Sequence, residues 1–223
     1  RDLHKEYRRQ RQMCIRDRDS DLTMELSNGL RALLEALVGP GTALSQATLN
    51  EVIAKVPNAR LDDHPLIKTD PETRVRHARG QSLPDWLEMH SGNVNTFPDG
   101  VAFPESSEQV RELLAHAKKN NLIVIPYGGG TSVVGHINPE TSDKPILTID
   151  MAKMNSMLSI DSESQLATFG AGAPGPVVEK ELKKHGYTLG HFPQSWELST
   201  LGGWVASLSL IHISEPTRRY AIS

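Results

Sequence analysis

Apolar residues follow two periods along this chain, a helical one before residue 57 and a strand-like one after residue 100. Between residues 22 and 56 they recur every three or four positions, which predicts an amphipathic helix. Its apolar face is formed by Leu30, Leu33, Leu34, Leu37 and Val38. Gly39-Pro40-Gly41 follows directly and ends this helix, because neither residue type favours its continuation. A second short helix is expected over residues 45–56.

Residues 58–95 are polar and contain several proline, glycine, histidine and arginine residues. This composition predicts an extended segment that crosses the molecule and is ordered by docking, with one helical turn near Leu83–Met89. With the two preceding helices it forms an expected N-terminal helical and extended segment, residues 19–95.

The pattern changes after Gly100 to that of a βαβ unit. A strand is predicted at Val101–Phe103, a helix at Ser106–Asn120 and a second strand at Leu122–Pro126. The helix is expected to turn four residues inward: Val110, Leu113, Leu114 and Ala117. The apolar run from Leu122 to Ile125 suits a strand buried on both faces, as parallel sheets require.

Three more strands and one helix complete the predicted domain. The strands are expected at Ile146–Asp150, Met157–Ile160 and Leu166–Phe169, and the helix at Val177–His185, closed by Gly186. The predicted fold class is α+β with a mixed sheet, and residues 96–207 form its second unit.

The two ends of the chain do not read as native protein. Met13–Arg18 and Leu208–His212 can be encoded by opposite strands of one DNA sequence, which unrelated segments would match only by accident. That DNA resembles a sequencing-library adaptor, and the flanking residues continue it. We therefore expect residues 1–18 and 208–223 to be adaptor-derived and to pack poorly against the rest.

Removing these ends changes the charge balance. They contribute +4 and +1 to a net charge of −3, so residues 19–207 carry about −8, which argues against a nucleic-acid partner.

The single cysteine, Cys14, lies in the first end, so the remaining segment has no thiol chemistry or disulfide. No residues show metal-ligand spacing, and no metal is predicted. No apolar run approaches the roughly 18 residues of a membrane span. Localisation stays open, and would be cytoplasmic for a bacterial source.

A glycine-rich loop directly follows the strand predicted at Leu122–Pro126. It comprises Pro126, Tyr127, Gly128, Gly129, Gly130, Thr131 and Ser132. Three residues without a Cβ can reach positive φ, and such a loop can direct several N–H groups at one anion. The pattern is neither a Walker loop nor a G-x-G-x-x-G fingerprint. A plain tight turn is the alternative interpretation.

A second candidate segment covers residues 190–206, GHFPQSWELSTLGGWVA. Ser199 or Thr200 can cap a helix that begins near Leu201. Gly202 and Gly203 permit close approach of a ligand or of another element. Taken alone, this segment reads as a helix N-terminus.

Together the two segments resemble those that wrap FAD in the vanillyl-alcohol-oxidase type of flavin enzymes, whose FAD-binding domain is called PCMH-type. Two sequence segments resemble alkyldihydroxyacetonephosphate synthases. They are GHFPQSWELSTLGGWVAS at residues 190–207, with Trp204 after the glycine pair, and ARGQSLPDWLEMHSG at residues 78–92. Glycolate and D-lactate dehydrogenases of this superfamily usually have Asn at the position of Trp204. The resemblance covers about residues 70–207 and implies that the C-terminal part of the domain is missing.

The resemblance implies roles for individual residues. Residues 128–132 would hold the FAD diphosphate, with Pro126 and Tyr127 leading into the loop. The flavin and ribityl side would be lined by Gln194, Ser195, Ser199 and Thr200, and Gly202 and Gly203 would be further cofactor-binding positions. Family members with covalent flavin often carry His where Thr131 stands, so noncovalent FAD is expected. His191 is a candidate for a catalytic or substrate contact, the alternative being a hydrogen-bonded, partly buried histidine beside Phe192.

Three functions remain open. The resemblance implies a flavoenzyme of ether-lipid synthesis, which exchanges an acyl chain for an alkyl chain without net redox. The alternatives are an FAD-dependent dehydrogenase of a 2-hydroxy acid, of the glycolate or D-lactate type, and a nucleotide-binding fragment without activity. The expected partner is a small-molecule or lipid substrate. Peripheral membrane contact and a homodimer are compatible with the resemblance.

Overall fold

The structure, a computed structural model, describes residues 27–42 and 45–207. The expectation that residues 1–18 and 208–223 pack poorly therefore falls outside the described residues. Within them the fold is α+β, with a four-stranded mixed sheet and a separate two-stranded hairpin, which confirms the predicted class. No helix in the described ranges is long and apolar enough to cross a membrane.

The larger sheet has the strand order β1-β2-β4-β3. Its strands are β1 (Ile67–Lys68), β2 (Gly100–Ala102), β3 (Ile123–Tyr127) and β4 (Ile146–Asp150). β4 pairs in parallel with both β2 and β3, whereas β1 is antiparallel to β2. β1 comes from the upstream segment, so this sheet spans the boundary expected near residue 95.

β3 lies at the edge of this sheet, which corrects the expectation that it is buried on both faces. The strands buried along their whole length are β2 and β4, because each lies between two other strands. Ile125 packs with Tyr127, Ile137 and Ile146 on one side of the strand, whereas Leu122 and Val124 are only half-buried and pack against the cluster of Ala102, Leu113, Leu147 and Ile149 on the other.

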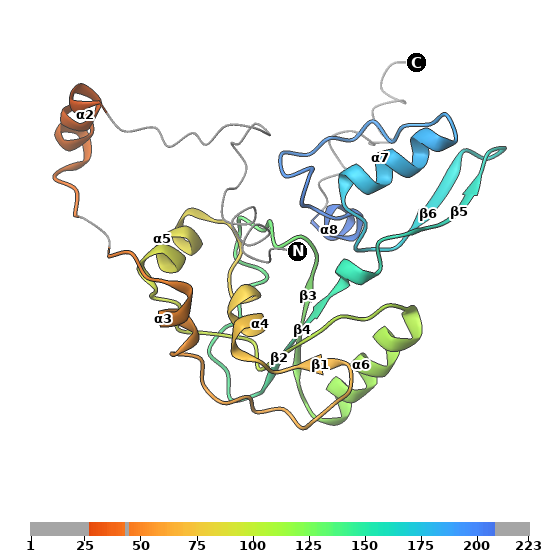
Figure 1. The fold of residues 1–223 in the computed structure, drawn as a ribbon, viewed down its shortest axis with the longest axis horizontal. Helices are drawn as coiled ribbons and strands as arrows, with labels where there is room; N and C mark the ends of the chain where they lie inside the picture. The colour runs from red at the N-terminus through yellow and green to blue at the C-terminus, as the bar shows by residue number, and fades with distance from the viewer. Residues whose placement is uncertain (1–26, 43–44, 208–223) are drawn as a thin grey trace, which may run out of the picture.

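Helices cover the two faces of the sheet (Figure 1). α6 (Ser107–Lys119) begins at the cap Ser106, whose hydroxyl accepts a hydrogen bond from the Gln109 N–H. Leu113 of α6 packs against Ala102, Leu147 and Ile149. Successive strand residues point to opposite faces, so Thr148 and Asp150 lie on the other side, toward α4 (Pro71–Arg76). Leu114, expected inward, is 48% exposed.

The upstream segment contains more regular structure than expected. α2 (Asn28–Val38) is capped by Ser27 and ends at Gly39, where φ is +88°, and α3 (Leu49–Ile53) is shorter than expected. Between residues 58 and 95 the chain forms β1, α4 and α5 (Leu83–Ser91), so a mostly extended segment was the wrong expectation. Asp70 and Ser82 cap α4 and α5, and both helices begin with proline in their first turn. α2 stands apart from the other elements (Figure 1).

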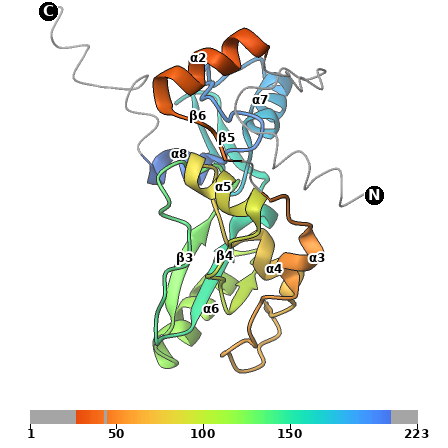
Figure 2. The ribbon, with the colours of Figure 1, turned by 90° about the vertical axis from the view of Figure 1, so that its left-hand side faces the viewer.

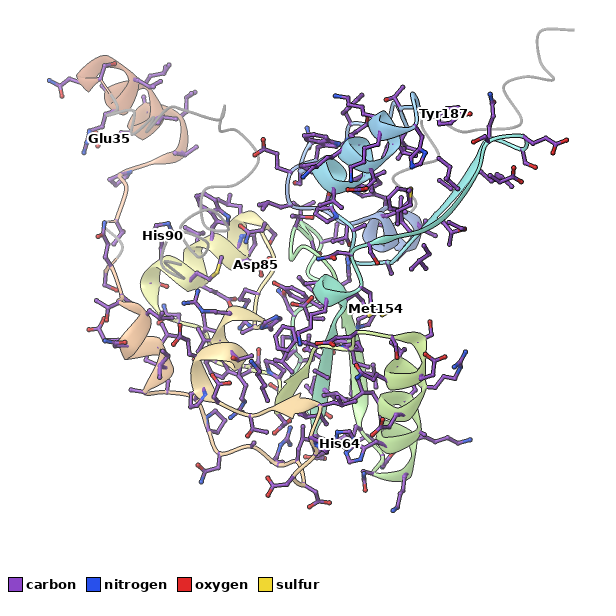
Figure 3. The ribbon with its side chains drawn as sticks, turned by 45° about the vertical axis from the view of Figure 1, so that its right-hand side comes forward. Glu35, His64, Asp85, His90, Met154 and Tyr187 are labelled. Atoms are coloured by element: carbon purple, nitrogen blue, oxygen red, sulfur yellow. The ribbon has the colours of Figure 1, made fainter. Side chains whose placement is uncertain are left out.

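The chain from residue 151 onward forms a second lobe beyond the sheet (Figure 2). A 3-10 turn, η1 (Met151–Lys153), leads into the hairpin of β5 (Met157–Asp161) and β6 (Leu166–Phe169). α7 (Gly175–Lys184) packs on the hairpin through Val178 and Leu182, and α8 (Leu201–Ala206) follows. Met154, labelled in Figure 3, lies where the two lobes join.

Candidate functional site

The glycine loop begins where β3 ends. Tyr127 is buried and pairs in register with Asp150, whereas Pro126 is exposed. Of the three glycines that follow, only Gly130 has a positive φ, +69°. The expectation that the triplet is needed for its backbone conformation therefore holds for Gly130 alone. Gly128 and Gly129 are required for a different reason, the proximity of another segment.

The side chains of His77 and Asp150 lie beside Tyr127, the residue that leads into the loop. The His77 ring nitrogens lie 2.7 Å from the Thr73 carbonyl and 3.0 Å from Asp150 Oδ2. The ring of Tyr127 lies 4.6 Å from that of His77. Burial, with a smaller contribution from the Asp150 carboxylate, raises the pKa of Tyr127, so its phenol is neutral. A methyl group on Gly130 would overlap the phenol oxygen of Tyr127. The loop therefore packs directly on this side chain at Gly130.

The second candidate segment, residues 194–200, folds into consecutive turns before α8. The Ser199 N–H donates to the Ser195 carbonyl at 2.7 Å. The Thr200 hydroxyl accepts from the Gly203 N–H and caps α8, as the sequence predicted. The Ser199 hydroxyl accepts a 2.7 Å hydrogen bond from the Trp204 indole. Ser199 and Thr200 are buried, whereas Gln194 is exposed and Ser195 half-buried.

The two segments meet. A methyl group on Gly129 would overlap the Leu198 carbonyl, and one on Gly128 would overlap the Thr200 hydroxyl. Gly129 is therefore in contact with the Leu198 backbone and Gly128 with the Thr200 side chain, although about 70 residues separate the two segments in the sequence. The two segments that the resemblance places around FAD thus lie against each other.

The loop presents backbone donors for which the described residues supply no acceptor. Within residues 27–42 and 45–207, none of the N–H groups of residues 129–132 donates a hydrogen bond. Thr131 and Ser132 are half-buried. A row of unpaired N–H groups beside a positive-φ glycine suits an anion such as a diphosphate. The residues present therefore fit the group that the sequence implies.

The glycines at 202 and 203 are in different surroundings. A methyl group on Gly202 would come within 2.8 Å of both the Cβ and the carbonyl oxygen of Ala171. Gly202 therefore allows α8 to approach Ala171, which lies between β6 and α7. At Gly203 the nearest atom is the Thr200 hydroxyl, 3.3 Å away.

His191 is buried at 4% exposure, and neither ring nitrogen has a hydrogen-bond partner among the described residues. Its ring meets Trp204 edge to face at 5.1 Å, and the neighbouring Phe192 is 61% exposed. This corrects the alternative of a hydrogen-bonded, partly buried histidine. Burial lowers the pKa of His191 below its usual 6.5, because the charged ring would lose its hydration.

The lowered pKa predicts how the stability of the chain depends on pH. Below about pH 6.5 the unfolded chain gains a proton on this ring that the folded chain resists, so the free energy of unfolding decreases. Replacing His191 with Phe removes this contribution. We expect His191→Phe to show a shallower decrease between about pH 7 and pH 5, measured by urea unfolding at each pH.

The matched control is Phe192→Leu, an exposed neighbour without a titrating group. It should retain the pH dependence of the unsubstituted chain. Identical pH dependence in His191→Phe and in the unsubstituted chain would contradict the role assigned to the buried ring.

The contact between His77 and Asp150, beside Tyr127, was not predicted from the sequence. Nothing in the spacing of His77 and Asp150 connects them, since 73 residues separate them and the contact arises from sheet order. Asp150 carried one usable signal, because it ends a predicted strand next to the strand that leads into the loop.

Comparison with known proteins gives a consistent result. Residues 98–214 match the family described as FAD binding domain, a range that runs past residue 207. An alkyldihydroxyacetonephosphate synthase from Dictyostelium discoideum is 41% identical over 149 residues, covering 67% of this chain and 24% of that protein. A D-lactate dehydrogenase [cytochrome] 1, mitochondrial, from Saccharomyces cerevisiae is 30% identical over 123 residues, covering 55% of this chain and 20% of that protein.

A solved structure of an alkyldihydroxyacetonephosphate synthase superposes with a TM-score of 0.65 at 33% identity. The superposition covers 78% of the present chain and 35% of the synthase chain. The present chain thus spans about a quarter of the length of the synthase that it matches in sequence. The family match covers more than half of the chain and includes both candidate segments. The chain belongs to the FAD-binding-domain family.

Proposed function

We propose that residues 126–132 and 194–200 form one wall of a noncovalent FAD site in an alkyldihydroxyacetonephosphate synthase. The whole protein would exchange the acyl chain of an acyl-dihydroxyacetonephosphate for a fatty alcohol, releasing a fatty acid, and so make an ether lipid precursor. The observation that carries this proposal is the contact of Gly128 and Gly129 with residues 198–200, beside N–H groups that have no acceptor in the part of the chain that the structure describes. The similarity to synthases at 41% identity supports the activity.

Each part of the wall has a distinct task in this proposal. The N–H groups of residues 129–132 bind the diphosphate, and the hydroxyls of Thr131 and Ser132 add hydrogen bonds. Gln194 and Ser195 face the flavin and ribityl side, while Thr200 packs against Gly128 of the loop and the Ser199 hydroxyl holds Trp204 of α8. His191 is the candidate substrate contact, since its buried nitrogens have no partner among the described residues. Bound FAD would supply the reactive isoalloxazine ring.

The alternative is an FAD-dependent dehydrogenase of a 2-hydroxy acid, favoured by the similarity to a D-lactate dehydrogenase. The two activities have different substrates, and only the dehydrogenase reduces an external electron acceptor. Purified whole protein should therefore release fatty acid from acyl-dihydroxyacetonephosphate when fatty alcohol is present. Acceptor reduction with D-lactate or glycolate, without that release, would favour the dehydrogenase. A protein that binds flavin but is inactive in both assays would favour the third function, nucleotide binding without catalysis.

The mode of flavin attachment is a separate prediction. Thr131 carries no imidazole that could form a covalent link, so the whole protein should be yellow and should release its flavin on acid precipitation. The flavin absorbance of the supernatant and the pellet measures this. Flavin that stays with the denatured protein would contradict the noncovalent site.

A further inference from the structure

The far arm of the glycine loop, residues 131–138, has little structure of its own. Within it, Val133 and Val134 are 59% and 77% exposed, and the arm forms neither helix nor strand. Ile137 is the buried apolar anchor near its end. An arm of this kind can hold its N–H groups in one orientation only if other parts of the chain fasten it.

Three hydrogen bonds fasten this arm to the upstream segment 80–85. At its start, the Ser132 carbonyl accepts from the Gln81 N–H at 2.6 Å. At its end, Asn138 Oδ1 accepts from the Gly80 N–H at 2.9 Å, and Asn138 Nδ2 donates to Asp85 Oδ1 at 2.5 Å. Gly80 must be glycine here, because a methyl group would overlap the Ser132 carbonyl.

Asp85 is buried at 3% exposure and its other oxygen is also engaged. Asp85 Oδ2 accepts from the Ser82 N–H at 2.9 Å and from the Ser82 hydroxyl at 2.7 Å, which forms the capping box of α5. Asp85, labelled in Figure 3, therefore links the start of α5 to the loop. The orientation of the Asn138 amide follows, since a carboxylate needs a donor and the Gly80 N–H needs an acceptor.

We propose that Asn138 and Asp85 are positioning residues that hold the glycine loop in the shape that receives the FAD diphosphate. The inference deepens the proposed function and rests on it. Neither side chain is assigned a contact with the flavin. They act through Ser132 and Gly80, so the loop is ordered before FAD arrives and binding does not bear the entropic cost of ordering it.

A charge-neutral exchange of the two side chains tests this pairing. Asn138→Asp places two carboxylates against each other. Asp85→Asn leaves one amide oxygen in place of two acceptor oxygens, so either Asn138 or Ser82 loses its acceptor. The double variant Asp85→Asn/Asn138→Asp restores the pattern. Its amide at position 85 would accept from Ser82 and donate to the carboxylate at position 138, which would still accept from the Gly80 N–H. Asn95→Asp, at an exposed position, is the control for an added charge.

Two measurements separate the contact from its function. Amide exchange of Gly80 and Gln81, in the 223-residue chain without FAD, reports the contact itself. FAD titration of the whole protein reports its effect on the site. Each single variant should speed exchange and weaken FAD binding by about tenfold or more, while the double variant should return both to within about threefold.

Rescue in both measurements would support the proposal, with Asn95→Asp close to the unsubstituted protein. Single variants with unchanged exchange, or with faster exchange but unchanged FAD affinity, would overturn it. So would a double variant as impaired as the singles. An unsubstituted whole protein that binds no FAD would overturn the proposed function and this role with it, and the exchange rates would then still show whether the contact exists.

Discussion

Gly129→Val is expected to abolish flavin retention in the whole protein. A side chain at this position would overlap the Leu198 carbonyl, so the loop and residues 198–200 would have to separate. Forcing added atoms into a close contact costs about 1–3 kcal/mol, and here the displaced atoms form the proposed binding wall. The ratio of flavin absorbance to protein absorbance after gel filtration measures the result. A full flavin complement would disprove the loop assignment.

Two companion variants locate the effect. Gly41→Val changes a glycine with nothing within 4 Å and no positive φ, and should keep its flavin. Thr131→Ala leaves the backbone in place and removes one hydroxyl hydrogen bond. It should weaken FAD binding about fivefold, since such a bond contributes on the order of 1 kcal/mol.

Asp99→Ala is expected to produce the largest loss of stability. The Asp99 carboxylate is buried and accepts hydrogen bonds from Arg60 Nε at 2.9 Å and Nη2 at 2.8 Å, and from the Ile146 N–H at 2.8 Å. Its removal leaves the Ile146 N–H without this acceptor and Arg60 without its ion pair. Arg60 is 45% exposed and stays hydrated, so the main loss is at the buried Ile146 N–H, and we expect the free energy of unfolding to fall by about 1–3 kcal/mol, measured by urea denaturation.

The acid dependence of stability should change in the same variant. Burial acts to raise the pKa of Asp99, but the hydrogen bonds from Arg60 and Ile146 outweigh it and lower the pKa below 3.8. This stabilisation is present above pH 3.8 and is lost as pH falls through the lowered value, so Asp99→Ala should lose less stability in acid. Asp143→Ala, at an exposed position, should stay within about 0.5 kcal/mol of the unsubstituted chain. Equal losses in the two variants would contradict the role of Asp99.

The local pattern predicted the strands and helices of the second half of the chain closely. β4 and β6 have the predicted bounds, and α6 differs by one residue at each end. What the pattern could not predict is the sheet order. The Leu122–Ile125 run suggested a strand buried on both faces, yet long-range pairing puts β4 between β2 and β3 and leaves β3 at the edge.

The candidate site was predicted in its two main segments and missed in its supports. The glycine triplet and residues 194–200 stand out by composition, and the structure brings them together. The partners that hold the loop come from the segment expected to be extended. His77 contacts Asp150 and Asp85 contacts Asn138, across 73 and 53 residues. Contacts at such separations depend on the whole topology and leave no local period in the sequence.

The strand order β1-β2-β4-β3 has a consequence for biosynthesis. A ribosome releases β2 and β3 before β4, the strand that must come to lie between them. Until residues 146–150 have emerged, β3 lacks its partner and β2 lacks its parallel neighbour, so unpaired N–H and C=O groups are exposed. A pause in translation after β3 has emerged from the ribosome and before β4 has emerged should therefore yield an aggregation-prone nascent chain that depends on chaperones, whereas release of β4 lets the sheet close.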